Sequence, residues 1–146
     1  MRPATADDLP AVVALLADDP LGQGREHAGD PAYRAAFDRI DADPAHLLAV
    51  AADGDDVVGT LQLSVLPGLS RAGALRGQIE GVRVRRDRRA QGLGDALVRW
   101  AVEESRRQGC ALVQLTTDLT RADAHRFYER LGFVHTHAGY KRGLLG

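Results

Sequence analysis

The sequence predicts one α/β domain (of the α+β kind) with a mixed central sheet and helices on both of its faces. Segments with helical periodicity alternate with short apolar segments that are typical of strands. Some neighbouring strands are joined by hairpins, as at the turn Asp53-Gly54-Asp55, whereas others are separated by a helix. The sheet is therefore expected to contain antiparallel and parallel pairs. A chain of 146 residues is one ordinary domain, and we assign residues 1–146 to it.

Composition narrows the class of protein. Hydrophobic residues make up 45% of the chain, charged residues 27%, and the net charge is −1, as in an ordinary globular protein. No apolar run approaches the ~20 residues of a membrane span, and the N-terminus lacks a secretory signal. The single cysteine, Cys110, excludes an internal disulfide and fits a reducing compartment. We therefore expect a cytoplasmic protein without a membrane partner, and a structural role for Cys110.

The first half of the chain is expected to contain three strands and two helices. The first helix has an apolar stripe with Pro10 near its start, and a loop at 18–24 follows it. The second helix begins with Asp30 as cap and Pro31 at the first position, and it ends within 41–44. The stripe of the first helix is Leu9, Val12, Val13 and Leu16, and the three strands are predicted at 2–4, 47–51 and 57–65.

The second half is expected to begin with a long connection over 67–77 that carries no regular structure beyond a turn. A strand at 79–84 and a helix from Leu93 to Gln108 should follow, because Gly109 is placed to end that helix. The remaining predicted elements are a strand at 111–117, a helix that starts at Thr120 or Asp123 and stops at Gly132, and a final hairpin made of Phe133-Val134 and Tyr140-Lys141.

The segment Arg88–Asp95 lies where a predicted strand turns into a helix. Gly92 and Gly94 let the backbone approach a ligand there, and unpaired N–H groups with the positive end of the helix dipole favour a phosphate. A tight connection without a ligand is the alternative. The Rossmann fingerprint is excluded because Leu97 stands where its third glycine belongs, and a P-loop is excluded because Asp95 follows Gly94 in place of lysine.

The pattern Arg89-x-x-Gly92-x-Gly94 resembles the acetyl-CoA pyrophosphate loop of the GNAT N-acetyltransferase superfamily. About 35 residues later, Ala124-x-x-x-Tyr128-x-x-Leu-Gly-Phe resembles the C-terminal signature of the same superfamily, and the run 123–128 also resembles aminoalkylphosphonate N-acetyltransferases. Two motifs in this order are far more specific than either alone, and the resemblance extends over the whole chain. It implies the GNAT fold, with a mixed, mostly antiparallel sheet of six to seven strands, helices on both faces and a splay between strands four and five.

The resemblance implies acetyl-CoA as co-substrate. The pantetheine is expected along the strand 79–84, with the N–H of Val82 placed to polarise the thioester carbonyl. Arg121 stands where many relatives have an asparagine that holds the pantetheine, so either its guanidinium substitutes or that contact is missing. The histidines and glutamates show no metal-binding spacing, so no metal is expected. The residues implied in cofactor binding are Val82, Val84, Arg88, Arg89, Ala90, Gln91, Gly92, Leu93, Gly94, Asp95 and Arg121.

The resemblance also implies the catalytic groups. Tyr128 matches the family tyrosine that protonates the departing CoA thiolate, with a packing role as the alternative. Glu80 is the candidate general base, acting directly or through water, and the alternative is a solvated or arginine-paired side chain. Glu26 and His27 fall where relatives shape the acceptor pocket. His125 lies three residues before Tyr128 and is either a substrate residue or a histidine satisfied by a backbone group.

Five arginines in seven positions surround this region, and phosphates of the cofactor explain them better than nucleic acid does, because the net charge is near zero. Strand alternation places Arg83 and Arg85 on the same face, and exposure of that face to solvent is a further explanation for these two arginines. The cluster is Arg83, Arg85, Arg86, Arg88 and Arg89.

We predict direct transfer of an acetyl group from acetyl-CoA to a primary amine of a small molecule. The alternatives are a peptide or protein amine and a non-catalytic acyl-CoA-binding sensor. No nucleic-acid or membrane partner is expected. Relatives often dimerise, but no feature of the sequence fixes the assembly, so a homodimer is one of the arrangements left open.

Overall fold

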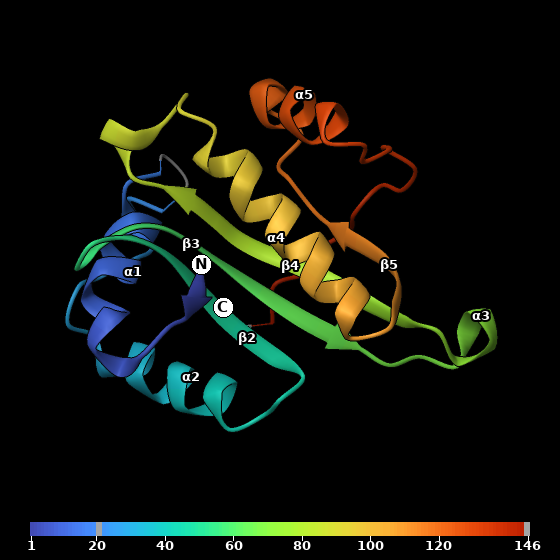
Figure 1. Ribbon diagram of the computed structural model, residues 1–146, viewed down its shortest axis with the longest axis horizontal. Coiled ribbons are helices and arrows are strands. Elements are labelled where there is room, and N and C mark those ends of the chain that lie inside the picture. Colours follow the sequence, from blue (N-terminus) through green and yellow to red (C-terminus); the bar gives the residue numbers. More distant parts are fainter. Residues whose placement is uncertain (20–21, 145–146) are drawn as a thin grey trace.

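The computed structural model describes residues 1–19 and 22–144, so that positions 20–21 of the predicted loop at 18–24 lie outside the described residues. Its centre is a five-stranded sheet in the order β1-β2-β3-β4-β5 (Figure 1). β1 to β4 pair antiparallel, whereas β4 and β5 are parallel. The mixed, mostly antiparallel sheet is confirmed. The strands are β1 (Arg2–Pro3), β2 (His46–Asp53), β3 (Asp56–Leu66), β4 (Leu75–Val84) and β5 (Cys110–Leu115).

The predicted helices form close to their expected bounds. The Asp30 side chain accepts a hydrogen bond from the Ala32 N–H at 2.8 Å, and Pro31 begins the second helix, as the sequence predicts. Pro10 is accommodated in the first turn of α1, which follows a short helical turn at Ala6–Asp8. The helices are α1 (Leu9–Ala17), α2 (Pro31–Asp41), the single turn α3 (Ser70–Gly73), α4 (Leu93–Arg107) and α5 (Ala122–Arg130).

Different helices cover the two faces of the sheet. Successive side chains of a strand point to opposite faces, and in β2 Ala49 and Ala51 pack in a core cluster with α4, whereas Val50 packs with α1 and α2. Figure 1 shows α4 crossing one face of the sheet and α1 with α2 lying beside the first strands. Among the described residues, no helix combines the length and apolar character that crossing a bilayer requires.

The predicted C-terminal hairpin is wrong, and the expected count of six to seven strands is not confirmed, since the described residues form a sheet of five. Residues 133–144 contain no strand among the described positions. Val134 is 77% exposed and Tyr140 is 96% exposed, so the two short segments bury too little apolar surface to offset the entropy of ordering a hairpin.

The connection predicted at 67–77 is shorter than expected, because β4 already begins at Leu75. Gly77 lies inside β4, where α4 packs closely on the strand. A Cβ atom at this position would stand 2.5 Å from Oγ of the buried Ser105. Gly77 therefore permits helix packing and does not break the strand.

The pairing of β4 with β5 stops part-way along β4. The register ends at Ile79↔Leu115, where β5 also ends, and β4 continues to Val84. Residues 80–84 thus keep a backbone edge that no described strand covers. The resemblance implied a splay between the fourth and fifth strands; here the pairing stops because β5 ends at Leu115.

Candidate functional site

A β-bulge interrupts β4 where it leaves β5. Gln62 pairs with Glu80 and Thr60 pairs with Arg83, so Gly81 and Val82 together face a single residue of β3. Gly81 has φ = 61°, a left-handed conformation that glycine adopts without steric cost. The bulge therefore depends on the glycine in the Ile-Glu-Gly-Val run.

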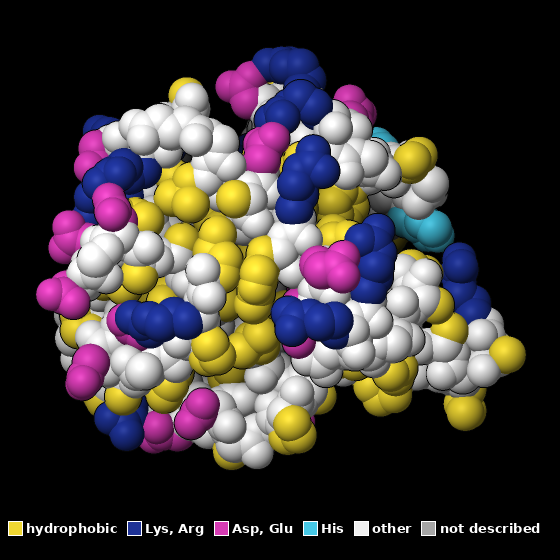
Figure 2. Space-filling view, viewed as in Figure 1, with side chains coloured by type: hydrophobic (Ala, Val, Ile, Leu, Met, Phe, Trp, Pro, Cys, Tyr) yellow, Lys and Arg dark blue, Asp and Glu magenta, His cyan; other side chains and the backbone are white. Residues whose placement is uncertain are grey.

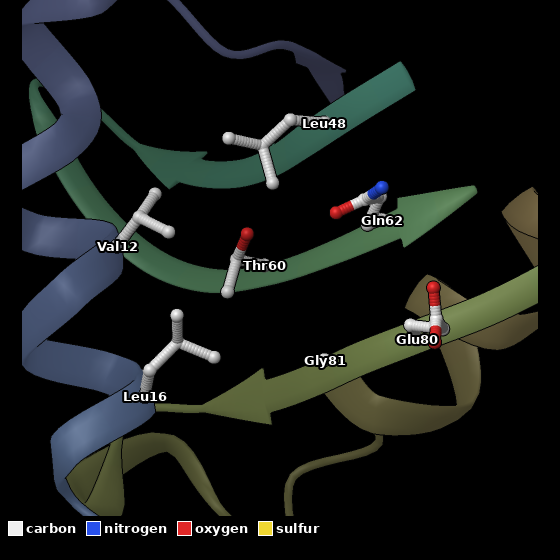
Figure 3. Close-up of a pocket in the computed structure, with 7 residues that line it drawn as sticks. All are labelled: Val12, Leu16, Leu48, Thr60, Gln62, Glu80 and Gly81. Atoms are coloured by element: carbon white, nitrogen blue, oxygen red, sulfur yellow. The ribbon is translucent and has the colours of Figure 1, made fainter. Parts of the chain in front are cut away.

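Two cavities flank the bulge. The first, of about 280 Å³, lies between α1 and the strands, and Figure 3 shows Val12 and Leu16 of α1 facing the strand side chains. The second, of about 480 Å³, lies beside the uncovered part of β4 and the start of α5. The first is lined by Val12, Leu16, Leu48, Thr60, Gln62, Glu80 and Gly81. The second is lined by Asp19, Val82, Arg83, Val84, Arg89, Thr120, Arg121, Ala122, Asp123 and Ala124.

Several predicted site residues meet at these cavities. Glu80 is exposed in the first cavity and is the only charged residue among the seven that line it. Val82, Val84, Arg89 and Arg121, all predicted for cofactor binding, line the second. The uncovered edge of β4 offers backbone N–H and C=O groups to an extended ligand there.

The glycine loop leads directly into α4. Ala90 (φ = 59°) and Gly92 (φ = 79°) are both left-handed, and the first helical hydrogen bond runs from the Ala96 N–H to the Gly92 carbonyl at 3.0 Å. The N–H groups of residues 93–95 precede that bond and suit an anion. Gly94 also lies close to α5, since a Cβ atom there would stand 3.4 Å from the Phe127 ring.

The arginines of this region form ion pairs with carboxylates. The sequence analysis interpreted these arginines as phosphate ligands or solvated side chains and did not predict the ion pairs. Arg88 pairs with Asp53 at 2.5 Å, and Arg89 pairs with Asp18 at 2.8 Å. Figure 2 shows basic side chains interspersed with acidic ones and no continuous basic patch on that face. The further pairs are Arg83–Asp19, Arg85–Asp87, Arg86–Asp18 and Arg130–Asp95.

Tyr128 is half-buried on α5, on the helix face that also carries the cavity residue Ala124 four positions earlier. Its ring packs edge-on against Phe127 and Phe133 at centroid distances of 5.0 and 5.8 Å. Burial raises the pKa of the Tyr128 hydroxyl, and the positive charges of Arg121 and Arg83 oppose that rise. The hydroxyl therefore keeps its proton at neutral pH and can donate it.

The three residues predicted for acceptor binding lie elsewhere. Glu26 accepts a hydrogen bond from the Tyr33 hydroxyl at 2.7 Å, which raises the pKa of Tyr33, and the His27 N–H donates to the same hydroxyl at 3.1 Å. His125 Nε2 lies 3.1 Å from the Asp118 carbonyl oxygen. None of the three is among the residues that line either cavity.

Two further findings concern reactive groups. Burial raises the pKa of the Cys110 thiol, which therefore stays protonated and weakly nucleophilic at neutral pH. Among the described residues, no group of three or more histidine, cysteine, aspartate or glutamate side chains is arranged to hold a metal ion.

Comparison with known proteins identifies the family. Residues 9–133 match the model of the acetyltransferase (GNAT) family. The chain belongs to the GNAT acetyltransferase family. It is an acyltransferase, and acetyl-CoA is its acetyl donor, as the loop and the uncovered edge of β4 suggested.

Relatives of this GNAT protein match along nearly its whole length. An aminoalkylphosphonate N-acetyltransferase of Salmonella typhimurium is 32% identical over 144 residues, which cover 99% of this chain and 90% of the relative. A structure from Bacillus halodurans described as a transcriptional regulator has a TM-score of 0.95 and 46% identity, with 98% and 97% of the two chains covered. A putative acetyltransferase from Agrobacterium tumefaciens has a TM-score of 0.84 and 32% identity, with 97% of each chain covered.

Proposed function

We propose that this protein transfers the acetyl group of acetyl-CoA directly to a primary amine of a small molecule. One observation carries the proposal: the consecutive residues 80–84 of β4 line both cavities. Glu80 and Gly81 line the smaller cavity, whereas Val82 to Val84 line the larger one. An amine in the first cavity and a thioester in the second would meet at the bulge, where direct transfer needs no covalent enzyme intermediate.

The smaller cavity suits a small amine. Its volume of about 280 Å³ lies near the lower end of small-ligand sites, and Val12, Leu16 and Leu48 give it an apolar wall. Glu80 supplies its one charge, which attracts an ammonium group. In the proposed reaction Glu80 accepts the proton of the amine, directly or through water, and the lone pair of the nitrogen attacks the acetyl carbon.

Other residues complete the proposed machinery. The N–H of Val82 polarises the thioester carbonyl, and the backbone of Val82 and Val84 pairs with the pantetheine amides. The loop at 88–95 holds the pyrophosphate, mainly through backbone N–H groups. The Tyr128 hydroxyl donates the proton that the CoA sulfur takes up as the carbon–sulfur bond breaks.

A thiol-release assay with a panel of alkylamines, amino sugars and aminoalkylphosphonates tests the proposal, with mass spectrometry of each product. Glu80→Gln should lower kcat by about 10²–10⁴-fold, the usual worth of general acid–base assistance, and leave KM for acetyl-CoA nearly unchanged. Glu103→Gln is the control, because Glu103 lies on the exposed face of α4 and pairs with Arg106.

Three outcomes would redirect the assignment. Binding of acetyl-CoA without acetylation of any amine would favour a sensor, a role that agrees with the regulator name of the Bacillus halodurans relative. Acetylation confined to peptides would favour a protein substrate. Unchanged kcat of Glu80→Gln across pH would remove Glu80 as the base.

A further inference from the structure

A buried carboxylate connects the two sides of the larger cavity. Asp19, just after α1, is only 6% exposed. Its Oδ2 accepts a hydrogen bond from Nη2 of Arg83 at 3.2 Å, and its Oδ1 lies 3.6 Å from Nη2 of Arg121. Arg83 belongs to β4 beyond the bulge, whereas Arg121 directly precedes α5. One side chain therefore holds a guanidinium from each of the two elements that flank the opening.

Arg83 depends on this carboxylate. Its side chain is 16% exposed, and its Nη1 donates to the Val82 carbonyl at 2.9 Å. Its Nε is buried and has no hydrogen-bond partner among the described residues. Because a desolvated guanidinium is costly without an opposite charge, removal of Asp19 would free Arg83 from its present position.

The cluster carries a net positive charge, since two guanidinium groups share one carboxylate. It also lies beside the helix that carries Tyr128, because Arg121 is the N-cap of α5 and Ala124, one turn before Tyr128, lines the same cavity. In agreement with this placement, the charges of both Arg121 and Arg83 lower the pKa of the Tyr128 hydroxyl against the effect of burial. All three charged side chains line the larger cavity, the one that contains the uncovered edge of β4.

We propose that Asp19 is a positioning residue that holds Arg83 and Arg121 beside Tyr128, where their positive charge stabilises the CoA sulfur as it leaves. This inference rests on the proposed acetyl transfer. In that reaction a carbon–nitrogen bond forms and the carbon–sulfur bond breaks. The electron pair of the broken bond goes to sulfur, which then takes the Tyr128 proton. A fixed positive charge stabilises this developing negative charge more than it stabilises the neutral thioester, so the effect appears in kcat.

Kinetics of five variants test the inference. Asp19→Asn and Arg121→Gln should each lower kcat at saturating acetyl-CoA at least tenfold, with KM for acetyl-CoA changed less than threefold. The double variant should be little worse than either single variant, because the two residues act as a unit. Arg121→Lys keeps the charge and should keep kcat within threefold. Asp18→Asn is the matched comparison: Asp18 pairs with Arg86 and Arg89 near the glycine loop, so its loss should alter KM and leave kcat unchanged.

A second measurement does not depend on acetyl transfer. The chain has three tyrosines, and comparison with Tyr128→Phe isolates the Tyr128 step in an ultraviolet titration of tyrosinate. Arg121→Gln should raise the pKa of Tyr128, because a nearby positive charge is removed. If no amine is acetylated, the proposed function fails, and this titration still decides the arrangement.

The inference is overturned if Arg121→Gln leaves both kcat and the Tyr128 pKa unchanged. It is equally overturned if Asp19→Asn raises only KM for acetyl-CoA. Should Asp19→Asn fail to fold, the comparison of Arg121→Gln with Arg121→Lys decides, since the Arg121 side chain is 41% exposed and tolerates substitution.

Discussion

Replacement of Gly81 by alanine tests whether the bulge in β4 organises the site. Gly81 has φ = 61°, and a Cβ atom there would meet its nearest neighbour, Cδ2 of Leu16, only at 3.8 Å. Alanine therefore causes no clash, and its cost is the left-handed backbone alone, about 1–2 kcal/mol. If the bulge relaxes to escape that cost, Glu80 and Val82 move relative to each other. A displacement of about 1 Å at a reacting group can lower activity by about 10²-fold.

Gly54 provides a matched control. It has φ = 60° in the β2–β3 turn, and a Cβ atom there would meet nothing within 4 Å. Gly54→Ala should thus lose a similar free energy of unfolding, about 1–2 kcal/mol, without losing activity. Urea titration followed by fluorescence of Trp100, the single tryptophan, measures the first quantity, and kcat/KM in the thiol-release assay measures the second. Gly81→Ala losing no more kcat/KM than Gly54→Ala would refute the reasoning.

Three further predictions follow from individual contacts. Tyr128→Phe should lower kcat at least tenfold by a factor that stays constant from about pH 6 to 9, since the pKa of the hydroxyl is raised above its usual ~10; a factor that disappears at the alkaline end would contradict the role of acid. Asp8→Asn should cost about 1–2 kcal/mol, because the half-exposed Arg2 donates to Asp8 at 2.7 and 2.8 Å. The pKa of Asp8 is lowered in the folded protein, so this loss should be complete above about pH 5. It should shrink as the pH falls below about 4, because the unfolded wild-type chain then takes up a proton at Asp8 whereas the folded chain keeps Asp8 ionised; urea titrations at pH 7 and pH 3 check it. Gly77→Ala should cost about 1–3 kcal/mol by overpacking against Ser105, and Ser105→Ala should recover part of that loss in the double variant; additive losses would exclude the contact.

Local sequence signals predicted most helices and strands because the residues that start or end each element lie within or beside that element. The Asp30 cap and Pro31 define the start of α2, and the left-handed Gly109 ends α4. The hairpin predicted at 133–141 does not form for the opposite reason: Val134 and Tyr140 have strand propensity, but nothing in the described structure covers either side chain. Propensity without burial does not form a hairpin.

The candidate site was predicted in outline, since the glycine loop, the strand with Glu80 and the helix with Tyr128 have sequence signatures. The cavity walls supplied by α1 were not. Leu16 was assigned to the core stripe of α1, whereas Leu15 is the buried residue and Leu16 lines the smaller cavity. Helical periodicity identifies the residues on the apolar face of a helix, but it does not identify which of those residues borders a cavity.

Arg83 shows most clearly why charged residues of the site escaped prediction. Strict alternation along a strand places it with Arg85 on an open face, but just past the bulge its side chain is only 16% exposed. Its partner Asp19 lies 64 positions earlier, beyond the reach of any local pattern. Once topology brings the end of α1 to β4, however, the pair follows from electrostatics, because a buried guanidinium needs a carboxylate. Asp18 and Asp19 are the acidic residues at that end of α1, so the fold and the charge requirement together select them where the sequence alone cannot.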